Sequence, residues 1–209
     1  MPRRLTTTPT RGLTPAELPL GAILITMTQR FAASQWVPFP VELVFAFFAN
    51  PSNLPHLMPA ELRTRIEDVR LEPPPPRPMA ADPARRFKSL AAGTGSEIRI
   101  SFRPVAWLPK RVSWTARIVE FAWNSHFIDE QIRGPFAGFV HRHGTLAETR
   151  DGVEGTLVSD DIQFSLPGGV LGKAAQGRVR KQLETSFAHR HKRLPEILTV
   201  AARQAAQRS

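Results

Sequence analysis

The chain has 209 residues, enough for one domain, and a domain of this size buries roughly 70% of the surface of its unfolded chain. It contains no cysteine, which excludes disulfides, thiolate metal sites and a cysteine nucleophile, and fits a reducing cytoplasm. No apolar run approaches the roughly 20 residues of a membrane-spanning helix, so we expect a soluble, cytoplasmic protein.

Positive charge is concentrated near the C-terminus. The formal net charge is +10, and residues 170–209 carry nine Lys or Arg against Glu184 and Glu196, a net charge of +7. Such a segment permits contact with an anionic membrane or another acidic partner. Phe187 is its only aromatic residue, and nucleic-acid-binding motifs are missing, so we expect no nucleic-acid partner. We interpret most of this charge, Arg190 included, as a solvated helix face.

Residues 1–27 are rich in Thr, Pro and Arg without a sustained hydrophobic period, and we interpret them as a disordered leader. Met27 is an alternative candidate for the start of the protein. Alternation over residues 29–37 then predicts the first strand, with Phe31, Ala33, Gln35 and Val37 on one side.

Two short helices are expected next. Pro40 suits the first position of a helix, and an apolar stripe follows it at i, i+3, i+4 and i+7. Asn50 and Pro51 repeat the start signal and predict a second helix over residues 52–57, which Pro59 ends. The stripe consists of Val41, Val44, Phe45 and Phe48.

A strand is predicted over residues 63–71, and an insertion from Pro73 to Gly93 follows it. The insertion begins with four consecutive prolines, which donate no hydrogen bonds to a sheet and favour an extended polyproline segment. We interpret it as an inserted loop that is either a lid over a cavity or a linker.

From residue 96 onward strands follow one another without a helix, which is typical of an antiparallel sheet. The predicted strands cover residues 96–103 and 111–121, the two arms of a hairpin over 127–145 with Gly134 and Pro135 in its connection, and residues 155–166.

The end of the chain changes to a helical period, which predicts one long amphipathic helix. We expect Pro195 to kink or end it, with residues 197–207 as a continuation that frays, so the domain covers residues 28–198 and residues 199–209 form a frayed tail. The apolar stripe is Leu171, Ala175, Val179, Leu183, Phe187, His191 and Leu194.

This order of elements resembles the SRPBCC superfamily, which includes START and polyketide cyclase/dehydrase-like proteins. The similarity runs from about Gln29 to Ile197, and its carriers are residues 37–59, 127–143 and 155–167. The resemblance implies an α+β helix-grip fold: a curved seven-stranded antiparallel sheet around a long C-terminal helix, with two short helices between strands 1 and 2. It also implies a cavity between sheet and helix for an apolar or amphipathic molecule, but no single activity.

Strand alternation places the polar residues of the hairpin on one face, and we expect that face to point toward the long helix. The chain has no tyrosine, so a phenolic acid or oxyanion donor is missing. The expected ligand-binding residues are Phe45, His56, Phe102, Trp114, Phe127, Asp129, Gln131, Phe139, His141, His143, Asp160, Phe164, Leu183, Phe187 and His191.

Several roles remain open for these polar residues. They could satisfy one another, for instance one of the two histidines with Asp160, or orient a ligand. Asp129, His141 and His143 are candidates for acid–base catalysis. The pair His141 and His143 could also begin a metal site, although we expect no metal and no cofactor. We interpret His56 and His191 as packed or rim histidines.

The leading hypothesis is therefore a protein that binds a hydrophobic or amphipathic small molecule such as a lipid, a quinone or a polyketide-like compound. One alternative is a cyclase or dehydrase that acts on a polyketide-like carbonyl substrate. Another is a module that docks on an anionic membrane or a partner through the basic C-terminal helix. We expect a monomer or a weak dimer. Motifs for phosphate loops, serine hydrolases and zinc proteases are missing.

Overall fold

The computed structural model describes residues 28–206 except 81, 83, 84, 86, 88 and 105–109, and it leaves the side chains of residues 169–174, 205 and 206 undescribed. The predicted leader 1–27 lies outside the described residues. Seven strands form one antiparallel sheet in the order β1-β7-β6-β5-β4-β3-β2. They are β1 (Gln29–Val37), β2 (Arg65–Arg70), β3 (Glu97–Phe102), β4 (Val112–Ala122), β5 (His126–Arg133), β6 (Gly138–Arg150) and β7 (Val153–Ser165).

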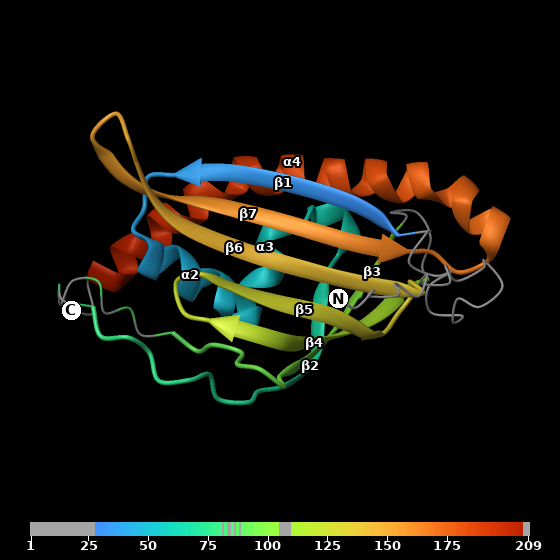
Figure 1. Ribbon diagram of the computed structural model, residues 1–209, viewed down its shortest axis with the longest axis horizontal. Helices are drawn as coiled ribbons and strands as arrows, with labels where there is room; N and C mark the ends of the chain where they lie inside the picture. The colour runs from blue at the N-terminus through green and yellow to red at the C-terminus, as the bar shows by residue number, and fades with distance from the viewer. Residues whose placement is uncertain are drawn as a thin grey trace, which may run out of the picture.

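The helices lie on one face of this sheet, and Figure 1 looks onto the opposite face. Two short helices, α2 (Val41–Ala49) and α3 (Leu54–Leu57), connect β1 to β2 and carry the chain from one sheet edge to the other. The long helix α4 (Gly169–Ala206) runs along β1 and β7. The predicted architecture is confirmed: a seven-stranded antiparallel sheet holds a long C-terminal helix, with two short helices between the first two strands.

Local signals explain the short helices. Asn50 accepts a hydrogen bond from the backbone N–H of Ser52 at 3.1 Å, and Pro51 opens the 3₁₀ turn η2 (Pro51–Asn53), which continues into α3. A further 3₁₀ turn, η3 (Ala60–Leu62), ends at Arg63 in the left-handed region with φ 45° and leads the chain into β2. The predicted second helix is thus a 3₁₀ turn followed by an α-helix.

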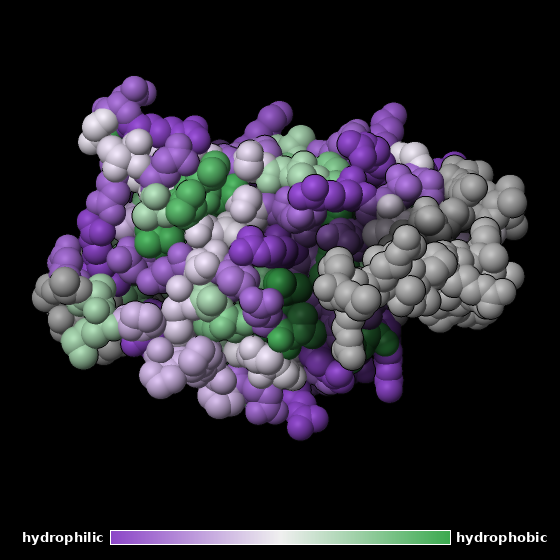
Figure 2. All heavy atoms as spheres, viewed as in Figure 1, coloured by the Kyte–Doolittle hydropathy of each residue, from purple (hydrophilic) through white to green (hydrophobic). Residues whose placement is uncertain are grey.

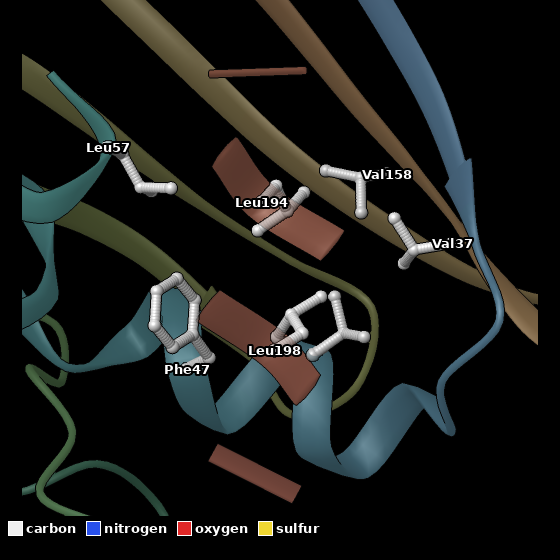
Figure 3. Packing of buried hydrophobic residues seen from close by; sticks show 7 residues of the cluster. Val37, Phe47, Leu57, Val158, Leu194 and Leu198 are labelled. Atoms are coloured by element: carbon white, nitrogen blue, oxygen red, sulfur yellow. The ribbon is translucent and has the colours of Figure 1, made fainter. Parts of the chain in front are cut away.

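Helix α4 does not end at Pro195 but continues beyond it, which is one of the two expected outcomes. The helix continues to Ala206, and Thr199 Oγ1 donates to the carbonyl oxygen of Pro195 at 2.8 Å. Leu194 and Leu198 are fully buried on either side of the proline. Figure 3 shows both leucines beside Val37 and Val158 of the sheet. Because Leu198 is part of the core, residues 199–206 extend the helix and do not form a separate frayed tail. No described helix is long and apolar enough to cross a membrane.

The face of the sheet that carries no helix is mainly hydrophilic, with scattered apolar side chains (Figure 2). Val140 and Leu146 of β6 are exposed. They alternate along the strand with His141, His143 and Thr145, which point to the helix-covered face. The interior polar side chains of β6 therefore lie on the helix-covered, concave face.

The described part of the insertion after β2 is anchored and is not a free linker. Trp123, in the turn between β4 and β5, donates from Nε1 to the carbonyl oxygen of Pro75 at 2.7 Å, and the guanidinium of Arg77 lies 4.2 Å from its ring centre. The backbone N–H of Ala92 donates to the carbonyl oxygen of Ala49 in α2 at 2.9 Å. At Gly93, a Cβ would lie 2.5 Å from the backbone of Pro74, so the close approach requires glycine.

Candidate functional site

The polar residues of the β5–β6 hairpin meet on the concave face because of the strand register. Phe127 pairs with His143 and Asp129 with His141 across β5 and β6. His143 in turn pairs with Asp160 of β7. Residues that pair across neighbouring strands share one face of the sheet. The sequence pattern therefore brings these side chains together without any bulge between them.

Two imidazole–carboxylate pairs result. His143 Nε2 is hydrogen-bonded to Asp129 Oδ2 at 3.0 Å, and His141 Nε2 is hydrogen-bonded to Asp160 Oδ1 at 2.9 Å. His143 Nδ1 lies 3.2 Å from Asp160 Oδ1, but without hydrogen-bonding geometry, so this contact is electrostatic. The two imidazole rings are 3.6 Å apart between centroids.

Arg190 of α4 completes this cluster. Its NH1 donates to Asp160 Oδ1 at 2.9 Å, and its guanidinium lies 4.6 Å from the ring centre of Phe48 and 5.2 Å from that of Phe187. The expectation that Arg190 faces water is wrong, because this residue is only 8% exposed. We call Asp129, His141, His143, Asp160 and Arg190 the polar belt.

The pKa values of the two histidines in the polar belt are shifted in opposite directions. Burial by itself would lower the pKa of His143, but the hydrogen bond to Asp129, the contact with Asp160 and the negative charge of both carboxylates raise that pKa. Burial and the positive charge of His143 lower the pKa of His141, and they outweigh its hydrogen bond to Asp160. These directions favour a charged His143 beside a neutral His141.

Asp160 is the centre of the belt. Burial would raise the pKa of Asp160, but the charge of Arg190, the hydrogen bond to His141 and the contact with His143 hold that pKa well below its ordinary value. The negative charge of Asp160 is thus balanced directly by Arg190. A buried set of charges that is paired in this way avoids the large penalty of an isolated buried charge.

An aromatic cluster adjoins the polar belt. Trp114 of β4 lies 4.4 Å from Phe139 and 5.4 Å from Phe136 between ring centroids, and Phe136 lies 5.8 Å from Phe164. The ring of Phe139 lies 6.3 Å from that of His141 between centroids, so the cluster contacts the polar belt there. Phe102, Trp114 and Phe136 are only partly buried. From α4, Val179, Leu183 and Phe187 pack against the same cluster.

The remaining predicted residues differ in how close they lie to the polar belt. Phe45 of α2 and Phe127 of β5 belong to an apolar cluster that reaches the belt where Phe127 stacks on His143. Gln131 is engaged at the β5–β6 connection, where it donates to the carbonyl oxygen of Phe136 at 2.9 Å. His56 is exposed in α3, and within the described residues its side chain makes no hydrogen bond.

His191 is half-buried next to Arg190. Its carbonyl oxygen accepts a hydrogen bond from Gln35 Nε2 at 2.8 Å. Burial and the charge of Arg190 lower the pKa of the His191 imidazole. The predicted apolar stripe of α4 included His191, but in this turn Arg190 is the residue that enters the interior.

Reasoning from the sequence missed two polar groups, Arg190 and Gln35. Arg190 is three residues after Phe187 and four before Leu194, a spacing that places it on the buried face of α4. Gln35 shares one side of β1 with Phe31 and Val37, and this alternation is the signal that could have identified it. Its Oε1 is buried, and among the described residues it has no hydrogen-bond partner.

Two hollows border the described residues. The larger has a volume of about 760 Å³ and lies beneath the insertion, between Leu71–Arg77, Phe87, Ser89–Ala91 and Trp123, and not between sheet and helix. The smaller, of about 250 Å³, lies beside the first turns of α4 and is lined by Gln29, Phe164, Gln176, Gly177 and Arg180. Phe164 belongs both to this hollow and to the aromatic cluster.

Comparison with solved structures identifies the fold. One match is protein TTHA0849 from Thermus thermophilus, with 18% identity, a TM-score of 0.52, and coverage of 83% of this chain and 99% of that one. Another is a START superfamily protein from Mycobacterium smegmatis, with 12% identity, a TM-score of 0.52, and coverage of 81% and 97%. The chain has the START-like helix-grip fold.

Ara h 8.0201 shares this fold at 11% identity and a TM-score of 0.53, with coverage of 83% of this chain and 99% of that one. No family model and no curated protein matches the sequence. Similarities at this level of identity describe the architecture of the START-like fold. The function of the chain therefore depends on its own side chains and not on its fold alone.

Proposed function

We propose that the chain, as a member of the superfamily that it resembles, binds a hydrophobic or amphipathic small molecule between the concave face of the sheet and α4. The apolar part of the ligand packs against the aromatic cluster, and its polar end meets the polar belt. The START-like fold and its match to a START superfamily protein support this proposal.

One observation carries the proposal: the aromatic cluster is incompletely covered and opens toward a hollow. Phe102, Trp114 and Phe136 stay partly exposed although they face the helix side of the sheet. The hollow of about 250 Å³ adjoins the cluster at Phe164. Ligand pockets are mostly apolar with a few polar groups, and typically measure about 300–1,000 Å³. We interpret the hollow as the entrance to such a site.

The polar belt fits a role in ligand orientation, because apolar residues of similar volume could fill the same interior without loss of stability. Replacing a buried ion pair by apolar residues of similar volume is often neutral or stabilising. Buried polar groups in an otherwise apolar interior are, for that reason, candidates for recognising a polar group of a ligand. Arg190 supplies further N–H donors beyond the one that Asp160 accepts.

Native mass spectrometry of the purified protein, with extraction of lipids, tests this proposal together with titration by a fluorescent hydrophobic probe. Leu183→Trp fills the space at the aromatic cluster, and we expect it to reduce saturable probe binding at least tenfold. Leu146→Trp places the same side chain on the exposed, opposite face and serves as the matched control. Absence of both a co-purified ligand and saturable probe binding would sink the proposal, and so would equal binding by Leu183→Trp.

Acid–base catalysis by a cyclase or dehydrase is the second candidate. It is favoured by the hydrogen bond of 3.0 Å between His143 and Asp129, since a carboxylate beside a histidine orients the ring for proton transfer and stabilises its charged form. With polyketide-like carbonyl substrates, His143→Ala should lower turnover by about 10²–10⁴-fold. Unchanged turnover in that variant excludes this mechanism. His126→Ala, in an exposed Glu120 pair, is the control.

A further inference from the structure

We propose that the polar belt binds one divalent transition-metal ion, such as Zn²⁺ or Co²⁺, through Asp129, His141 and His143. The inference concerns side chains of this chain alone and does not depend on the identity of any organic ligand. Its test is independent of the probe-binding experiments above.

The geometry of the three ligands carries the proposal. One potential ligand atom from each of Asp129, His141 and His143 lies within 4.8 Å of the other two. His143 Nε2 and Asp129 Oδ2 are 3.0 Å apart. Two ligand atoms that bind one ion at about 2.1 Å and at right angles are also about 3 Å apart. The ligands therefore need little movement to close on an ion.

Free ligating atoms are present at the cluster. Within the described residues, no hydrogen bond uses His141 Nδ1 or Asp129 Oδ1. When His143 binds the ion through Nε2, its buried Nδ1 stays 3.2 Å from Asp160 Oδ1, as a metal-bound imidazole requires on its other side.

Asp160 and Arg190 provide the surroundings that such a site needs. A histidine that binds a metal generally donates its other ring N–H to a carboxylate, which fixes the tautomer and the ring orientation. His141 Nε2 has this relation to Asp160, and Arg190 holds the same carboxylate oxygen at 2.9 Å. Phe127 stacks on the His143 ring at 4.3 Å and 20°, which limits the rotation of that ring.

The ligand types select the class of ion. Two imidazoles and one carboxylate suit Zn²⁺, Co²⁺ and Fe²⁺, whereas Mg²⁺ and Ca²⁺ prefer sites built from oxygen atoms. Three protein ligands leave at least one coordination position for water or an oxygen of a bound molecule. The three ligand side chains keep 12–18% exposure, so an ion can reach them.

The experiment uses tag-free, full-length protein that has been treated with a chelator and then titrated with Co²⁺ and Zn²⁺. We expect one ion per chain by elemental analysis, a visible ligand-field absorption for Co²⁺ that Zn²⁺ abolishes, and a higher Tm with Zn²⁺. Asp129→Asn keeps the shape of the side chain and should weaken Co²⁺ binding at least tenfold. His141→Ala and His143→Ala should abolish it.

Asp160→Asn tests the positioning role and should weaken binding by about 10- to 100-fold. His126→Ala is the matched control, because His126 is bonded to Glu120 on the surface and also forms an imidazole–carboxylate pair, at 2.7 Å. A featureless Co²⁺ spectrum of the unmodified protein overturns the proposal even if some variants fail to fold. Binding that is lost in His126→Ala, or retained in His141→Ala and Asp129→Asn, overturns it as well.

Discussion

Asp160 of β7 and Arg190 of α4 are joined by a buried hydrogen-bonded ion pair of 2.9 Å, which links the centre of the sheet to the long helix. The two side chains are 3% and 10% exposed. Helix and sheet are elsewhere held mainly by apolar contacts, such as those of Phe187 and Leu194, and the ion pair lies between these two residues on the same face of α4. The same carboxylate contacts both histidines of β6, which strand register places beside it.

Removing one member of this pair should strongly destabilise the fold. Breaking a buried ion pair leaves an uncompensated charge and typically costs about 3–5 kcal/mol. We expect Arg190→Met to lower the free energy of unfolding by about 3 kcal/mol, and Asp160→Asn plus Arg190→Met to lower it by less than the sum of the single changes. Urea denaturation measures both.

The neighbouring residue offers the control. Asp161 pairs with Arg30 on the exposed face at 2.7 Å, and such surface pairs contribute about 0–1 kcal/mol. Asp161→Asn should therefore change stability far less than Asp160→Asn. Equal effects of the two substitutions would show that the interior pair has no special role.

The last turns of α4 are part of the core, and a substitution beyond Pro195 tests this. Leu198 is fully buried, and Leu198→Ala should lower the free energy of unfolding by about 2–5 kcal/mol because it leaves a cavity. Val200 lies two residues further and is 53% exposed, so Val200→Ala should change stability by less than about 0.5 kcal/mol. Thermal or urea unfolding that does not distinguish these variants contradicts the packing of α4 after Pro195.

Two glycines should respond in opposite directions to alanine. A Cβ at Gly155 would lie 2.4 Å from the ring of Trp36 and 2.5 Å from the carbonyl oxygen of Val37, so Gly155→Ala must displace backbone and should destabilise the protein. A Cβ at Gly177 in α4 meets nothing within 4 Å, and Gly177→Ala should stabilise by about 0.5–1 kcal/mol through helix propensity. The Tm should therefore fall in Gly155→Ala and rise in Gly177→Ala.

The insertion depends on Trp123. Trp123→Ala removes the hydrogen bond to Pro75 and the contact with Arg77, so we expect faster cleavage by trypsin after Arg85, while the rest of the domain resists. Trp36→Ala is the control, because Trp36 donates to the carbonyl oxygen of Glu148 on another part of the sheet. An unchanged cleavage rate in Trp123→Ala would mean that other contacts hold the segment.

The basic outer face of α4 gives a test of the membrane or partner proposal. Arg178, Lys181, Lys192 and Arg203 are exposed, and within the described residues they form no ion pair. If α4 docks on anionic surfaces, binding to phosphatidylserine-containing vesicles should fall as salt rises, since screening weakens contacts between exposed charges. Lys181→Glu with Lys192→Glu should reduce co-sedimentation with these vesicles. Binding that ignores both salt and charge excludes this role.

The sequence by itself determined the order and the type of the elements. Alternation identified the strands, Pro40 and Asn50 marked the starts of the short helices, and a period of three and four residues identified the long helix. These signals are local, because each depends on side chains a few residues apart. They also predicted that Asp129, His141 and His143 share one face of a hairpin.

Only the tertiary structure decided what that face meets. The phase of α4 against the sheet placed Arg190, and not His191, beside Asp160, and this phase results from packing at Phe187 and Leu194. Packing also carried the helix past Pro195 and placed the larger hollow beneath the insertion. Such contacts join residues far apart in the chain, so no periodicity within a single segment records them.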